Sequence, residues 1–252
     1  ETEMEKYIWD IFSWQHPEII HTGLINIESE DAKMSKSKAQ KEVLSGVYTG
    51  WSDPRTWSIQ SLNARGILPD AIRDFVKELG ITKQNTTVPI ETLYALNRRL
   101  IDSTADRYSF VANPVKLELK NAPETSLIEV PVHPDKKLTR PVKVGEIFIS
   151  ANDLNKFQGQ EVRLLHLYNI KLKKDATAKF TSAENKDIPK INWVSEGVPA
   201  KVLMPNGKYV EGLAEYAIKT LKKDEVLQFE RFAFVKLHKK EQDQYEFWFA
   251  HR

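Results

Sequence analysis

The residues best suited to chemistry stand together in one pentapeptide, Lys33-Met34-Ser35-Lys36-Ser37. Ammonium groups at this spacing could approach ATP phosphates and the negative charge that develops on a pyrophosphate leaving group. The small hydroxyl residues favour a flexible loop, which could close only when the nucleotide is bound. An exposed loop rich in Lys and Ser, without any ligand, would have the same composition. The pentapeptide alone therefore leaves a nucleotide loop and a solvated surface loop open.

Composition excludes several other kinds of site. The 252 residues include no cysteine, which removes disulfides, Cys-zinc sites and thiol catalysis together. The six histidines show no spacing typical of metal ligands, so we expect no metal site. The sequence has no run of about 18 apolar residues, and its acidic first residues do not begin a secretory signal. We therefore expect a cytoplasmic protein with no membrane partner.

Helical periodicity dominates the sequence before residue 113. Pro69 and Gly80 bracket one expected helix, because proline suits the first turn and glycine the position just past the end. Apolar residues recur at helical spacing in the other segments. Four helices are expected, over 7–12, 58–65, 69–79 and 89–107.

After residue 113 the pattern changes to short strands separated by Pro and Gly, which is typical of antiparallel β-barrels. Pro205-Asn206-Gly207 predicts a hairpin turn, and the polar stretch 173–187 is expected to be a connection. The surplus of Lys and Arg lies in this second half and weakly favours a polyanion partner. Strands are expected over 115–119, 142–144, 146–149, 201–203 and 226–237.

The complete pentapeptide is the second class-defining motif of class I aminoacyl-tRNA synthetases, and further strings follow it in order. They are Gly50-Trp51-Ser52-Asp53-Pro54-Arg55, Ala64-Arg65-Gly66-Ile67, Asn113-Pro114-Val115-Lys116-Leu117, Glu161-Val162-Arg163-Leu164, Ile191-Asn192-Trp193-Val194-Ser195 and Gln228-Phe229-Glu230-Arg231. They are similar to motifs of the glutamyl/glutaminyl-tRNA synthetase family, which the chain resembles over essentially its whole length. Ser52 and Asn113 replace aspartates of the family's patterns. The short segment from Ile170 to Ala214 favours the C-terminal half of a glutamyl-tRNA synthetase of the archaeal type.

The resemblance implies a multidomain α+β chain. Residues 1–38 would be the C-terminal remnant of a Rossmann catalytic domain with the pentapeptide loop, and 39–113 a helical domain. Two antiparallel β-barrels would follow and bind the tRNA anticodon. The proximal barrel would combine 114–172 with 224–252, and the distal barrel would comprise 173–223.

The resemblance also implies the reaction, in which glutamate and ATP form glutamyl-adenylate before transfer to tRNA. Lys36 would be the catalytic residue, stabilising the adenylate-forming transition state. Lys33, Met34, Ser35 and Ser37 would complete the ATP-binding loop. Magnesium would accompany ATP without metal ligands from this part of the chain.

The same resemblance implies several contacts with tRNA. Gln228 and Arg231 match residues that read the middle anticodon base, although a surface polar pair is the alternative. Arg163 matches an arginine near the anticodon. Trp51, Asp53 and Arg55 would fix the join between the catalytic and helical domains close to tRNA, where a purely structural role is equally open.

The other class I motif, H-I-G-H, and the amino-acid pocket are missing from the sequence. We therefore expect this chain to need an N-terminal half, either as a separate subunit or as part of the same polypeptide, and residues 1–38 to expose an apolar patch without it. The expected RNA partner is tRNA-Glu, with tRNA-Gln as a second candidate. Alternatives are a glutaminyl-tRNA synthetase, a stand-alone tRNA-binding module and a structural scaffold.

Overall fold

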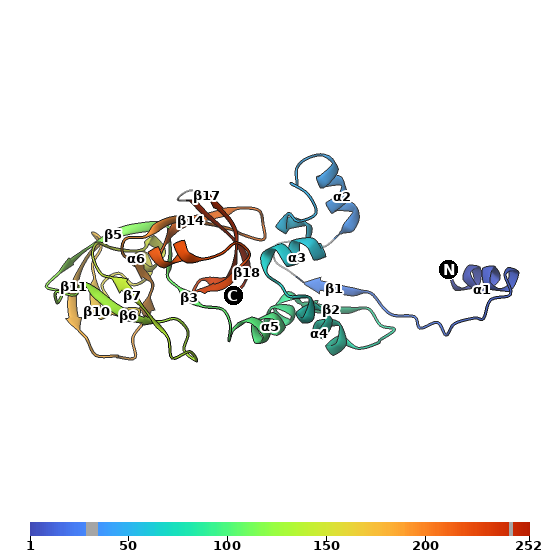
Figure 1. The fold of residues 1–252 in the computed structure, drawn as a ribbon, viewed down its shortest axis with the longest axis horizontal. Coiled ribbons are helices and arrows are strands. Elements are labelled where there is room, and N and C mark those ends of the chain that lie inside the picture. Colours follow the sequence, from blue (N-terminus) through green and yellow to red (C-terminus); the bar gives the residue numbers. More distant parts are fainter. Residues whose placement is uncertain (29–34, 242–243) are drawn as a thin grey trace.

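A computed structural model describes residues 1–28, 35–241 and 244–252. A short helix and an extended segment lead into a cluster of helices, which is followed by two curled β-sheets (Figure 1). Lys33 and Met34 of the pentapeptide lie outside the described residues, whereas Ser35, Lys36 and Ser37 lie within them.

The N-terminal helix, α1 (Thr2–Ile11), lies apart from the rest of the chain at the end of an extended segment (Figure 1). This helix includes most of the one predicted over 7–12. Its side chains are all at least partly exposed, and Tyr7 and Ile11 are 63% and 60% exposed. Its apolar face therefore lacks the packing that usually stabilises an amphipathic helix.

The chain rejoins the body at β1 (Ile25–Glu28), which pairs in parallel with β2 (Thr86–Pro89). Just before this strand, the Gly23 N–H donates to the Thr82 carbonyl at 2.8 Å. A Cβ at Gly23 would lie 2.1 Å from the Gln84 carbonyl oxygen, so only glycine fits this crossing.

The helical cluster contains α2 (Lys36–Leu44), the 3-10 helix η1 (Pro54–Thr56), α3 (Ile59–Arg65), α4 (Pro69–Leu79) and α5 (Ile90–Ile101). Ser58 begins α3 by accepting a hydrogen bond from the Ser61 N–H at 3.0 Å, and Gly66 ends it in the left-handed region. The helices predicted over 58–65 and 69–79 are therefore confirmed. The fourth ends at Ile101 instead of running to about 107, because residues 107 and 108 enter a sheet.

The first large sheet, called the far sheet here, lies at the end of the molecule away from the helices (Figure 1). Its strand order is β12-β9-β10-β11-β5-β8-β13. β12 and β13 are the two edge strands of the sheet, and only Asn192 separates them in the sequence. The sheet is therefore nearly closed. The strands are β5 (Pro114–Lys120), β8 (Ile147–Ser150), β9 (Glu161–Leu164), β10 (Asn169–Leu172), β11 (Thr177–Ser182), β12 (Lys190–Ile191) and β13 (Trp193–Val194).

The second large sheet, called the near sheet, packs against the helices through Phe234 and Ala250. Its order is β3-β16-β17-β18-β14-β15-β4, and its two edge strands are separated only by Ser109. The hairpin predicted at 205–207 joins β14 to β15. The strands are β3 (Arg107–Tyr108), β4 (Phe110–Ala112), β14 (Val198–Leu203), β15 (Tyr209–Ala214), β16 (Val226–Phe229), β17 (Ala233–Glu241) and β18 (Gln244–His251), with η2 (Tyr216–Thr220) between β15 and β16.

This pairing differs from the expected division of the β part. One barrel was expected to combine 114–172 with 224–252, and the other to comprise 173–223. The stretch 173–187, expected as a connection, contains β11, which pairs in parallel with β5 of the far sheet. Strand β14 pairs in parallel with β18, so both belong to the near sheet. Alternation of apolar residues identifies a strand, but the choice of a distant partner depends on contacts that the local pattern does not contain.

β6 (Leu127–Pro131) and β7 (Thr139–Lys143) form a hairpin. This hairpin contacts both large sheets, because its Ile128 and Val142 pack against the core of the far sheet and its Arg140 reaches the near sheet. Its Arg140 forms a buried ion pair with Glu215, which directly follows β15, and the Arg140 Nη2 to Glu215 Oε2 distance is 2.8 Å. Glu215 also accepts a hydrogen bond from the Ser109 N–H at 2.8 Å. Burial opposes the charge of Arg140, but the bond to Glu215 outweighs it and raises the pKa of the guanidinium. A buried pair of this kind holds its elements in one arrangement, because removing one partner leaves an uncompensated charge.

Candidate nucleotide loop and nucleic-acid interface

The described part of the pentapeptide forms the start of α2. Ser35 is extended, with φ −146°, and its Oγ accepts a hydrogen bond from the Lys38 N–H at 3.4 Å. Lys36 is the first helical residue, and its side chain is exposed. A helix N-terminus carries partial positive charge and favours anions, so a lysine there opposes the helix dipole unless an anion is bound. The position of Lys36 therefore suits phosphate binding better than helix stability.

An open depression of about 520 Å³ lies beside this helix start. It is lined by Ser35, Lys36, Trp51, Thr56, Trp57, Ser58, Ile59 and Gln60. The fold thus brings the end of the pentapeptide together with Trp51, which lies 15 residues beyond Lys36 in the chain. The Trp51 carbonyl accepts a hydrogen bond from the Thr56 hydroxyl at 2.9 Å, which holds the loop that carries the indole.

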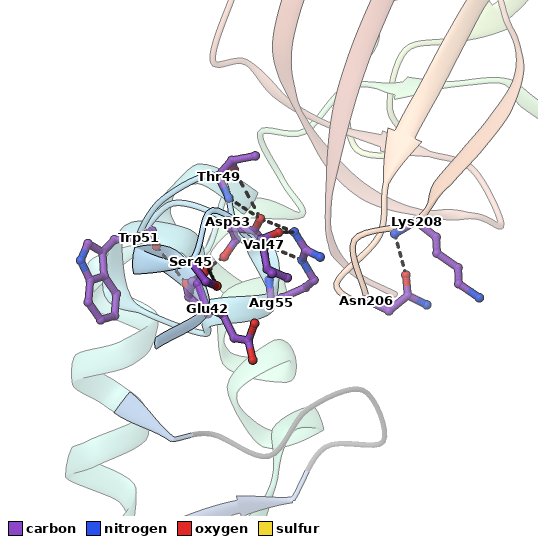
Figure 2. A network of polar contacts seen from close by, with 10 residues as sticks. Glu42, Ser45, Val47, Thr49, Trp51, Asp53, Arg55, Asn206 and Lys208 are labelled. Atoms are coloured by element: carbon purple, nitrogen blue, oxygen red, sulfur yellow. Dashed lines mark hydrogen bonds and ion pairs between the residues drawn. The ribbon is translucent and has the colours of Figure 1, made fainter. Parts of the chain in front are cut away.

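Asp53 and Arg55 form the centre of a polar network between the helices and the near sheet (Figure 2). The Asp53 carboxylate is almost fully buried and accepts from Arg55 Nε at 2.8 Å, from Arg55 Nη2 at 2.7 Å and from the Thr49 N–H at 3.1 Å. Burial opposes ionisation of Asp53, but the hydrogen bonds from Arg55 and Thr49 outweigh it and lower the pKa of the carboxyl. These hydrogen bonds tie Thr49, Asp53 and Arg55 together.

Arg55 also contacts the turn between β14 and β15, which carries Asn206 and Lys208 (Figure 2). A Cβ at Gly207 of this turn would lie 2.8 Å from Arg55 Cδ. Asp53 and Arg55 were expected at the join between a catalytic and a helical domain. The structure shows a further contact, in which Arg55 joins the helical cluster to the near sheet.

Gln228 and Arg231 lie at the end of β16 and in the turn that follows. Gln228 is half-buried, whereas Arg231 is exposed, in the left-handed region with φ 58°. Glu230, between them, lies where the two sheets meet. Its carbonyl accepts from the Asn192 amide, and its carboxylate lies 3.4 Å from His166 Nε2.

Arg163 is tied into the far sheet by its own hydrogen bonds. Its guanidinium donates to Asn169 Oδ1 at 3.0 Å and to the carbonyls of Leu167 at 3.2 Å, Ala183 at 3.2 Å and Glu184 at 3.0 Å. These bonds hold the turn after β9 and the segment after β11. Arg163 therefore has a clear structural role, and the structure brings His166 of that turn to Glu230.

His166 and Asn192 contact the Gln228–Arg231 turn from the far sheet, and sequence reasoning did not single them out. The only signal for Asn192 was its place in the string Ile191-Asn192-Trp193. The sequence offered no comparable signal for His166, because its role depends on a turn with φ 61° that directs the ring across the junction.

Within the described parts of the chain, no helix combines the length and the apolar character needed to cross a membrane.

Three family models match most of the chain, and all three describe domains of one family. The model described as tRNA synthetases class I (E and Q), catalytic domain, matches residues 1–103. Two models of the anti-codon binding domain of the same family match residues 105–187 and 190–238.

Curated relatives of the chain include archaeal glutamate–tRNA ligases. It is 37% identical to the glutamate–tRNA ligase of Pyrococcus horikoshii over 98% of the chain and 46% of that protein. It is also 37% identical to that of Methanocaldococcus jannaschii, over the whole chain and 47% of the relative. The chain thus spans about half the length of the curated relatives it matches.

Proposed function

Because this chain belongs to the class I tRNA synthetases for glutamate and glutamine, we propose that it is the C-terminal half of a glutamyl-tRNA synthetase of the archaeal type. The observation that carries the proposal is the order of the matches, in which a catalytic-domain region is followed by two anticodon-binding regions. The whole enzyme would attach glutamate to tRNA in an ATP-dependent reaction through glutamyl-adenylate. The cytoplasmic location expected from the sequence stays part of this proposal.

The residues at the start of α2 fit the phosphates of ATP. Ser35 closes the first helical turn, and the exposed Lys36 stands where the helix dipole already favours an anion. Lys36 would stabilise negative charge that develops during adenylate formation, with Lys33, Met34 and Ser37 completing the loop. ATP, with Mg²⁺, supplies the activated phosphate and the pyrophosphate leaving group.

The exposed apolar side chains of the N-terminal segment support the need for an N-terminal half. Met4, Tyr7, Phe12 and Trp14 are each between 59% and 65% exposed, although side chains of this kind are normally packed. An N-terminal half of the synthetase, as a separate subunit or as part of the same polypeptide, would cover them and supply the glutamate pocket.

We assign the two curled sheets to anticodon binding, with tRNA-Glu as the expected partner and tRNA-Gln as a second candidate. Gln228 and Arg231 would read the middle anticodon base, which is supported by the exposure of Arg231 at the junction of the sheets. Trp51, beside Lys36, would lie near the inner face of the tRNA. Arg163 would act by holding the turn that reaches the junction.

The deciding experiment is charging by the chain reconstituted with the N-terminal half of an archaeal relative. We expect glutamate to be attached to tRNA-Glu, and Lys36→Ala to slow adenylate formation by about 100-fold or more with tRNA affinity unchanged, as removal of transition-state stabilisation does. Lys38→Ala is the matched control, because Lys38 is exposed in the same helical turn. Equal activity of the Lys36 and Lys38 variants would remove the catalytic assignment.

Two other functions give different results in this assay. A glutaminyl-tRNA synthetase would attach glutamine, and a stand-alone tRNA-binding module would bind tRNA without activating either amino acid.

A further inference from the structure

Three adjacent strands of the far sheet carry lysines directly opposite one another. Lys120 of β5 is paired in register with Lys179 of β11, and Lys179 is paired with Lys171 of β10. All three side chains are exposed, whereas Ile170, Leu172 and Ala178, which alternate with them, are buried. Neighbouring strands are about 4.8 Å apart, so the row extends over about 10 Å. Like charges directly opposite one another destabilise a sheet, so this row has a cost unless an anion binds it.

The row continues into a hollow of about 500 Å³ on the same sheet. Its lining combines Lys171, Lys173, Lys174 and Lys179 with Gln158, Gly159 and Leu172. Across residues 1–28, 35–241 and 244–252, no ion pair involves any of these four lysines. We call these four residues, together with Lys120, the lysine row.

The carboxylates close to the lysine row balance only part of its charge, although Glu161 lies near enough to Lys171 and Asp175 near enough to Lys173 to interact electrostatically. Glu161, which faces Lys171 in register, accepts from the Thr181 hydroxyl at 2.6 Å and from Lys186 at 3.0 Å. Asp175 accepts from both the N–H and the hydroxyl of Thr177, and Glu118 pairs with Lys120 at 3.5 Å. The four lysines of the hollow therefore keep an excess of positive charge facing solvent.

The lysine row lies on the same face of the sheet as Arg163. Strands β9 and β10 pair so that Arg163 faces Asn169, two residues before Lys171. Because side chains two residues apart point to one face and lie about 7 Å apart, the row continues the surface that starts at Arg163. The turn held by Arg163 reaches the Gln228–Arg231 turn through His166.

We propose that the lysine row binds the phosphodiester backbone of an RNA strand, without regard to base sequence. Ammonium groups spaced across adjacent strands suit a series of phosphates, because lysine acts as a point charge that does not require one fixed geometry. The site adds a backbone contact to the base contacts proposed above, and the identity of the polyanion as RNA rests on the proposed function.

The test measures RNA affinity of the full chain across a salt series with two tRNA-Glu transcripts, one intact and one altered at the middle anticodon base. A variant with Lys171, Lys173, Lys174 and Lys179 all changed to Gln should reduce the dependence of log affinity on log salt by about 0.7 for each single-strand phosphate that it no longer neutralises. If the variant and the unaltered chain bind with equal affinity at 1 M salt, the loss of two such phosphate contacts corresponds to about 25-fold weaker binding by the variant at 0.1 M salt. Both transcripts should be affected equally, because phosphates carry no base information.

The matched control changes Lys83, Lys137, Lys222 and Lys223, four exposed lysines outside the hollow, to Gln. It removes the same charge and should leave the salt dependence close to that of the unaltered chain. A second variant with Arg at the four hollow positions keeps the charge and should keep the salt dependence, which separates a binding effect from misfolding.

Equal salt dependence of the hollow variant and the control would overturn the proposal. If the unaltered chain still prefers the intact transcript in that case, anticodon reading stands and only the lysine row is refuted. If the unaltered chain binds neither transcript, both this inference and the proposed tRNA binding fail. Poly-L-glutamate serves as a polyanion that carries carboxylates instead of phosphates. If the four Lys→Gln changes weaken its binding as much as they weaken RNA binding, the assignment to phosphates would be overturned.

Discussion

Acid should weaken the joint between the helices and the near sheet, because the ring of His251 is fully buried there. The ring packs between Tyr94 and Phe234, with centroids 5.5 Å and 5.0 Å away, and Asn97 Nδ2 lies 3.0 Å from Nε2. Burial lowers the pKa of His251 from 6.5 to about 4, and the nearby positive charge of Arg98 acts in the same direction. The fold therefore holds this histidine neutral.

The sign and size of the effect follow from this shift. The unfolded chain binds a proton at His251 near pH 6.5, whereas the folded chain does so only near pH 4. The stability contribution is therefore complete above pH 6.5 and is lost as the pH falls towards 4. From these two pKa values, proton linkage predicts that the free energy of unfolding decreases by about 2 kcal/mol between pH 7.5 and pH 5.0.

The assay is urea unfolding of the unaltered chain and of His251→Gln at both pH values. The amide oxygen of Gln can accept a hydrogen bond from Asn97, but it does not titrate. The variant should be less stable at pH 7.5. The difference in free energy of unfolding between the two chains should be smaller by about 2 kcal/mol at pH 5.0, because only the unaltered chain loses the histidine contribution. His21→Gln, in the exposed N-terminal segment, is the control for replacing a histidine elsewhere. A gap of the same size at both pH values would refute the reasoning.

Three further perturbations test the joints and the interface. Arg65→Met should lower the free energy of unfolding by about 3 kcal/mol in urea denaturation, because the carbonyls of residues 249 and 250 lose their buried donor; a decrease below about 1 kcal/mol would contradict this. Gly207→Ala should lower the melting temperature more than Gly159→Ala, because both glycines have φ near 80° but only a Cβ at position 207 would clash with Arg55. Equal melting temperatures of the two variants would show that Arg55 moves aside without cost. Arg231→Ala should weaken binding of the intact tRNA-Glu transcript by about 1–3 kcal/mol and that of the transcript altered at the middle base much less, so equal weakening for both would indicate a phosphate contact.

Local chemistry in the sequence was enough to predict the family and several of the elements, whereas others, such as α2, β6 and β9, were not predicted. Pro69 and Gly80 bracket a helix for two reasons. Proline lacks a backbone N–H, which has no partner within the first turn of a helix, and glycine tolerates the positive φ of the residue after the last turn. The turn at 205–207 and the strands on either side of it follow in the same way. The motif strings from the pentapeptide to Gln228-Phe229-Glu230-Arg231 predicted the family that the comparisons show.

Tertiary contacts decided how these elements combine. The weakly patterned stretch 173–187 contains β11, and its pairing with β5 places Lys120, Lys179 and Lys171 in one row. Arg163 is held by carbonyls outside its own strand. Local sequence determines backbone preference and alternation over a few residues, whereas strand pairing and burial depend on packing between segments that are distant in the chain, which no single segment encodes.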